Sequence, residues 1–98
     1  MRSDPEVQPA ELIADVVLAV PGVAGLHGGM FGEVATYLPG RRVLGVALGE
    51  ESCAVHISVA YPANVVETAE RVRTALAPML DVPVDVTVED VLTERTAP

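Results

Sequence analysis

Residues 9–19 have the apolar spacing of an amphipathic helix. Large apolar side chains recur every three or four positions, which places them on one face of a helix: Leu12, Ile13, Val16, Val17 and Val20. Pro9 suits a first helical turn, because its missing N–H would have no partner there. Pro21 and Gly22 predict that the helix ends near Ala19.

A second amphipathic helix is predicted from Asn64 to about Ala77. Asn64 suits the N-cap, and Glu67 three residues later completes a variant of the capping box. Pro78 cannot continue a helix, so we expect a stop or a kink near Ala77. The apolar face of this helix is formed by Val65, Ala69, Val72, Leu76 and Met79.

Other segments have the composition and alternation of strands. These segments are residues 23–26, 43–48, 53–61 and 82–88. The second and third are separated by a polar turn at 49–52, which predicts a hairpin. Residues 31–38 fit a helical turn and a strand equally well, so both interpretations stay open at this point.

The order of these elements predicts an α+β fold. We expect a two-layer sandwich, in which a small, mostly antiparallel or mixed sheet has two amphipathic helices on one face. Residues 9–92 would form the single domain, with flexible segments at 1–8 and 93–98.

Composition and charge narrow the classes of partner. The net charge is −8, and the six cations are all arginine. A chain without a large basic patch is not expected to bind nucleic acid, nor to adsorb directly to an anionic membrane. The longest apolar run, 16–20, is too short to insert into a bilayer. With one cysteine and no basic, apolar leader, the chain is expected to be cytoplasmic.

Few residues suit catalysis or metal binding. Cys53 and His56 are three positions apart, so on a strand their side chains point to opposite faces. We therefore expect no metal site, no catalytic pair and no cofactor. The glycine-rich segment 25–32 with His27 offers an alternative, a small ligand-binding protein or enzyme. It lacks the lysine and the glycine spacing of phosphate-binding loops, so a turn or bulge is favoured there.

The sheet face opposite the helices is the candidate interaction surface. Alternation within 53–61 leaves a small, mixed set of side chains on that face. Its candidate residues are His56, Ser58 and Ala60 from this segment, with Asp85 and Thr87 from the last strand. Arg41 and Arg42 are added as a pair that could recognise an acidic partner, including a second copy of this acidic chain.

An ordered series of motifs resembles the alkaline shock protein family. It runs over about residues 10–92 and consists of Val20–Leu26, Gly28–Gly32, Gly45–Glu50, the strand that ends in Ala60-Tyr61, the helix from Asn64, and Val84–Val88. The resemblance implies a non-enzymatic, cytoplasmic protein of Gram-positive bacteria that takes part in the cell-envelope stress response. Such proteins self-associate and are held at the membrane by a separate anchor protein. An adaptor for a soluble stress regulator is the remaining alternative.

Overall fold

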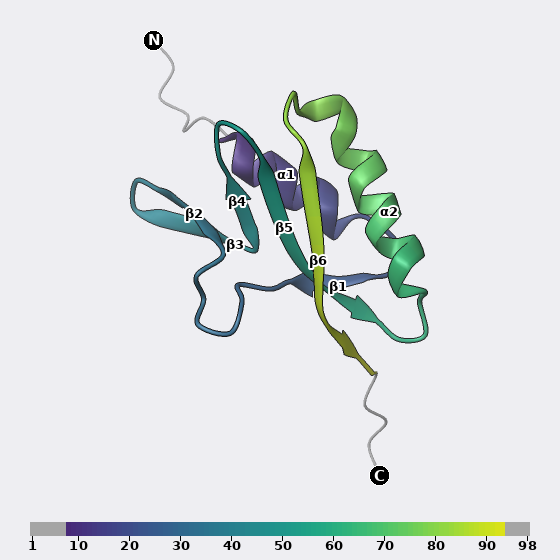
Figure 1. Ribbon diagram of the computed structural model, residues 1–98. Coiled ribbons are helices and arrows are strands. Elements are labelled where there is room, and N and C mark those ends of the chain that lie inside the picture. Colours follow the sequence, from purple (N-terminus) through teal and green to yellow (C-terminus); the bar gives the residue numbers. More distant parts are fainter. Residues whose placement is uncertain (1–7, 94–98) are drawn as a thin grey trace.

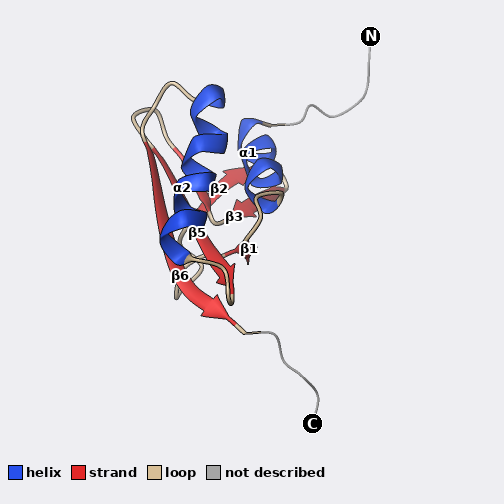
Figure 2. Cartoon of the chain, turned by 90° about the vertical axis from the view of Figure 1, so that its right-hand side faces the viewer, coloured by secondary structure: helices blue, strands red, loops and turns tan. Residues whose placement is uncertain are grey.

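The computed structural model describes residues 8–93 and confirms the α+β class (Figure 1). Its elements are α1 (Pro9–Leu18), β1 (Val23–Leu26), β2 (Ala35–Leu38), β3 (Arg41–Leu44), β4 (Val46–Leu48), β5 (Cys53–Ala60), α2 (Val65–Leu76), the short 3-10 helix η1 (Ala77–Met79) and β6 (Val84–Leu92). Figure 2 shows both helices on the same side of the main sheet, as the sequence predicts.

Strand β5 is the centre of the main sheet. Strand β6 runs parallel to it along one edge, from Cys53 opposite Val84 to Ala60 opposite Leu92, with a bulge after Ile57. The other edge of β5 is shared by two antiparallel strands, β1 along its second half and β4 along its first half. The predicted hairpin between residues 43–48 and 53–61 is therefore present as β4 and β5, and the last strand extends past residue 88 to Leu92.

The junction of β1, β4 and β5 lies at His56. The His56 N–H donates to the carbonyl of Gly45 over 2.9 Å, and the His56 carbonyl accepts from the His27 N–H over 2.9 Å. Gly45 has a φ of +84°, a conformation that favours glycine, and it breaks the chain between β3 and β4. The single strand predicted over 43–48 is wrong for this reason.

Residues 28–44, inserted between β1 and β4, form a loop and the small β2–β3 hairpin. This result decides the ambiguity at 31–38 in favour of a strand at Ala35–Leu38. The Thr36 side chain hydrogen-bonds the hairpin to β4. Its hydroxyl donates to the Val46 carbonyl over 2.5 Å and accepts from the Leu48 N–H over 3.0 Å. Thr36 thus satisfies backbone groups on the outer edge of β4.

The core between the layers is aliphatic. Strand β5 contributes Cys53, Val55, Ile57 and Val59, and α1 contributes Ala10, Ile13, Ala14 and Val17. The predicted buried face of α1 is wrong in part, because it included Leu12, which is 46% exposed. The buried face instead includes two alanines, whose small side chains let the helix lie close to the sheet.

Helix α2 has the predicted Asn64 cap and the predicted end, but the Glu67 side chain of the expected capping box pairs with Arg71. The Asn64 side chain accepts from the Glu67 N–H over 2.8 Å, and the α-helix stops at Leu76, before Pro78. Its buried residues are Thr68, Val72 and Leu76, so Thr68 takes a place that the prediction gave to Val65 and Ala69. The Thr68 hydroxyl packs against Gly22, where an added Cβ would lie only 2.5 Å from it. This hydroxyl has no hydrogen-bond partner among the described residues.

Candidate interaction surfaces

The predicted residues of β5 and β6 do lie together on the sheet face away from the helices. Register places Thr87 beside His56, while Asp85 lies beside Ala54 at the start of the two strands. Ser58, however, is only 5% exposed, because it is a short side chain between β1 and β6, which pair with β5 on either side of it. The prediction that Ser58 belongs to the contact surface is therefore wrong, because its side chain is buried.

Two histidine–carboxylate pairs flank the bulge on this face. His56 Nδ1 lies 2.5 Å from Glu89 Oε2, and His27 Nε2 lies 3.9 Å from Asp90 Oδ2. His27 Nδ1 also accepts from the Gly29 N–H over 2.9 Å, which assigns the proton of the neutral ring to Nε2. Within residues 8–93 no group of three or more histidine, cysteine or acidic side chains is arranged to hold a metal ion.

Sequence reasoning missed His27, Glu89 and Asp90 as neighbours of His56. Glu89 pairs with His56, and the bulge after Ile57 places Asp90 opposite Ser58, from where its carboxylate lies near His27. A regular alternating strand gives no signal for such a bulge. Cys53, by contrast, is buried on the helix side, where burial and then the negative charge of Asp85 raise the pKa of its thiol.

Arg41 and Arg42 lie on β3, away from the sheet face. Arg41 is engaged within the chain: its Nε donates to Glu11 Oε2 over 2.5 Å and its Nη2 donates to Glu11 Oε1 over 3.0 Å. This bidentate pair, with a further bond from the Gln8 N–H, lowers the pKa of Glu11 to about 2. The bond to Glu11 and its negative charge raise the pKa of Arg41. Arg42 is exposed and lines a shallow cavity between α1 and β3.

The glycine-rich loop after β1 presents two large apolar residues to solvent. Met30 is 83% exposed and Phe31 is 86% exposed. The backbone N–H groups that an anion would need are already bonded: Gly29 to His27 Nδ1, Phe31 to the Glu33 carboxylate and Val34 to the Gly28 carbonyl. We call Met30 and Phe31 the apolar tip.

All three aromatic residues of the chain lie on the surface. Besides Phe31, Tyr37 on β2 is 68% exposed and Tyr61 after β5 is 63% exposed. Aromatic side chains usually supply much of a buried core. Here the buried residues are aliphatic or small.

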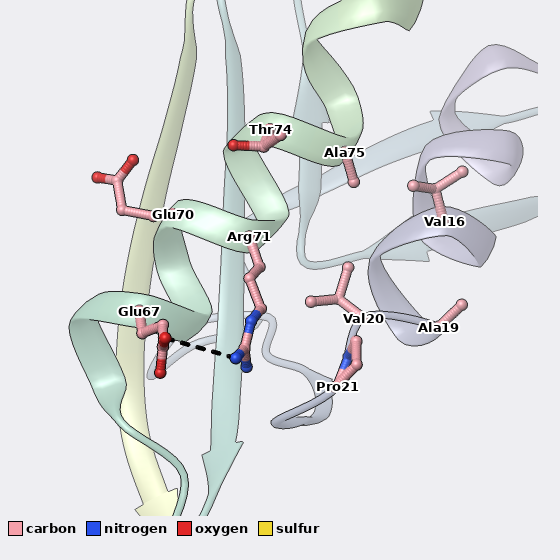
Figure 3. A pocket seen from close by; sticks show the side chains of 9 residues that line it. All are labelled: Val16, Ala19, Val20, Pro21, Glu67, Glu70, Arg71, Thr74 and Ala75. Atoms are coloured by element: carbon pink, nitrogen blue, oxygen red, sulfur yellow. Dashed lines mark ion pairs between the residues drawn. The ribbon is translucent and has the colours of Figure 1, made fainter.

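An open groove of about 790 Å³ lies between the end of α1 and the outer side of α2 (Figure 3). Its lining is mostly apolar on the α1 side, with Val16, Ala19, Val20 and Pro21, and continues on α2 with Ala75, Thr74, Arg71, Glu70 and Glu67. Arg71 Nη2 lies 3.5 Å from Glu67 Oε2, so these two rim charges are paired with each other. We call this region the helical groove.

No protein-family model and no curated protein matches this chain. Among solved structures, it is similar to a tryptophan-to-alanine variant of the MamM CTD, at 17% sequence identity and a TM-score of 0.54. The match covers 90% of this chain and 94% of that one. Over the described residues, no helix is both long enough and apolar enough to cross a membrane. What the chain shares with the MamM CTD is therefore an α+β fold extending over nearly all of both chains.

Proposed function

We propose that this chain is a non-enzymatic interaction module of the cell-envelope stress response. It self-associates and docks on a membrane-anchored protein at the cytoplasmic face of the membrane. The biological setting rests on the resemblance of its ordered motifs to the alkaline shock proteins. The molecular role rests on the surface of the fold.

The exposure of every aromatic residue is the observation that carries the molecular role. Aromatic residues are enriched among the residues that dominate the binding energy of protein interfaces. In this chain Phe31, Tyr37 and Tyr61 are each more than 60% exposed, while the core is built without them. Side chains that contribute little to folding and remain in solvent are best explained as contacts for another protein.

The ligand-binding alternative for the glycine-rich loop has less support. A loop that binds an anion presents free N–H groups, whereas this loop directs the N–H groups of Gly29, Phe31 and Val34 to its own acceptors. What the loop offers outward is the apolar tip, which suits contact with protein.

A comparison of the whole protein with a surface-aromatic variant tests the proposal. The variant carries Phe31→Ser, Tyr37→Ser and Tyr61→Ser, and its matched control carries Leu12→Ser, Leu18→Ser and Val66→Ser, three exposed aliphatic residues. Sedimentation velocity measures self-association, and cross-linking in cells followed by purification from membrane and soluble fractions identifies the partner.

We expect the wild type and the control to self-associate and to be recovered with a small membrane protein. The aromatic variant should keep its cooperative unfolding and lose both associations. A wild-type protein that is monomeric and is recovered alone would refute the proposal. Recovery of a soluble regulator in place of a membrane protein would favour the adaptor alternative.

A further inference from the structure

We propose that the outer edge of β6 binds a basic, extended segment of a partner protein, which adds to the main sheet as a further strand. This inference rests on the docking proposed above, and it takes the segment to belong to the membrane-anchored partner. It adds to that proposal the place of contact and the chemistry of the segment that binds there.

Strand β6 has one edge that no other strand occupies. Among residues 8–93 it pairs only with β5, and Figure 2 shows it as the outermost strand of the main sheet, with α2 on one face. The Cys53 N–H donates to the Pro83 carbonyl over 2.9 Å, and this register fixes which backbone groups of β6 point toward β5. The N–H and carbonyl groups of alternate residues point the other way. These residues are Val84, Val86 and Val88.

The free backbone groups of these three valines, which we call the β6 edge, select an extended chain as the occupant. No hydrogen bond between described residues uses them. An unpaired row of N–H and carbonyl groups is a template for another extended chain, and peptides that add to a sheet edge are held by such main-chain bonds. The bulge after Ile57 ends the regular part of the edge at Val88, so a segment of about five residues fits it.

The side chains beside the β6 edge are acidic on the sheet face away from the helices. Glu89 and Asp90 lie near His56 and His27, while the exposed Asp85 forms no ion pair with another described residue. Side chains that face each other across neighbouring strands have Cβ atoms about 4.5–5.5 Å apart. Lysine or arginine at alternate positions of an added strand would therefore lie beside these carboxylates.

The same charges argue against a second copy of this chain on the β6 edge. Pairing of two β6 strands would bring acidic side chains together, and like charges on neighbouring strands are destabilising. The net charge of −8 adds repulsion between copies and attraction toward a basic segment. A membrane-anchored protein supplies such a segment, because the cytoplasmic stretches next to membrane spans carry an excess of lysine and arginine.

NMR of the full chain with a synthetic peptide tests the β6 edge directly. In the peptide, lysine alternates with threonine over about eight residues, which gives it a basic face and a preference for the extended conformation. One control peptide has the same sequence with methylated amide nitrogens, so it keeps the charge and loses the donors. The other control peptide has glutamate in place of every lysine.

Two variants of the chain, each with a matched control, separate the charge from the backbone. Asp85→Lys reverses a charge beside the β6 edge, and Asp15→Lys makes the same change at an exposed position of α1. Val86→Pro removes one outward N–H, while proline at such a position spares the bonds to the inner strand. Val86→Thr is its control, because threonine is also branched at Cβ and keeps the N–H. Far-UV circular dichroism checks that each variant folds.

We expect the lysine peptide to shift the amide resonances of the β6 edge and to slow their hydrogen exchange, more weakly at high salt. Neither control peptide should do so. Asp85→Lys and Val86→Pro should bind the lysine peptide about tenfold more weakly than wild type. Asp15→Lys and Val86→Thr should bind it as wild type does.

The inference is overturned if hydrogen exchange at the β6 edge is unchanged by the lysine peptide, or if the methylated peptide binds equally well. It is also overturned if Asp85→Lys is recovered from cells with the same membrane protein, and in the same amount, as wild type. In each case recovery of that membrane protein with wild type would leave the proposed function standing. A wild type recovered alone would instead refute the proposed function, while the exchange data would still decide whether the β6 edge binds a basic strand.

Discussion

Replacement of Gly45 by alanine tests the packing at the centre of the sheet. A Cβ at this position would lie 2.8 Å from Leu26 Cβ, 3.0 Å from His27 N and 3.1 Å from His56 O. Two of these three atoms belong to the backbone of hydrogen-bonded neighbours, so they cannot rotate away. The φ of +84° adds its own strain for any residue with a Cβ.

The expected loss of stability in Gly45→Ala is the sum of a backbone cost and a packing cost. A left-handed conformation costs a non-glycine residue about 1–2 kcal/mol, and overpacking of a tight site costs about 1–3 kcal/mol. The Gly45→Ala variant should therefore lose roughly 2–5 kcal/mol of unfolding free energy. That is a large part of the roughly 5–15 kcal/mol of a typical domain.

Gly40→Ala is the matched control. Gly40 has a similar φ of +76°, but a Cβ there would meet nothing within 4 Å. The control therefore carries the backbone strain, and the matching change in unfolded-chain entropy, without the close contacts. Urea unfolding followed by far-UV circular dichroism measures both variants. If Gly45→Ala is no less stable than Gly40→Ala, the close approach of β1, β4 and β5 at this point is refuted.

Three further substitutions test individual contacts. Because the pKa of Glu11 falls from 4.5 to about 2 in the folded chain, its pair with Arg41 stabilises the fold above pH 4.5, and this contribution is lost as the pH falls toward 2. Thermal unfolding between pH 2 and 6 should show this loss in wild type and not in Glu11→Gln; parallel curves would contradict it. Thr36→Val should cost about 1–2 kcal/mol and speed hydrogen exchange at the Leu48 amide, since both bonds of the hydroxyl are lost; unchanged exchange would show that Thr36 does not hold the hairpin. Thr68→Val should raise the melting temperature, because it replaces a buried hydroxyl without a partner by a methyl group of similar shape, whereas a lower melting temperature would indicate a hidden partner.

The elements with a strong local signal were predictable from the sequence. Alternation in 53–61 identified the central strand, Asn64 identified a helix start, and Pro78 identified a helix end. In each case the signal and its cause are local: side-chain period, a cap and a missing N–H. These signals were sufficient to assign the two-layer class.

The features that depend on distant contacts were not predictable. Gly45 lies in an apolar run, and only the approach of β1 and β5 shows why it must interrupt the strand. Leu12 is more apolar than Ala10, yet the alanine is buried because α1 packs closely on the sheet. The exposure of Met30 and Phe31 could not be predicted either, because it depends on how the loop after β1 closes on itself.

The surface position of the aromatic residues also affects the circular dichroism spectrum of the folded protein. With no tryptophan and with Phe31, Tyr37 and Tyr61 in solvent, the folded chain has few rings in a fixed, asymmetric environment. Its near-UV circular dichroism should be weak even when the aliphatic core is fully packed. Weak near-UV signal beside a strong far-UV signal is normally taken as evidence of a molten globule. For this chain that pair of spectra describes the native state, and amide exchange or methyl resonances are needed to judge whether its core is intact.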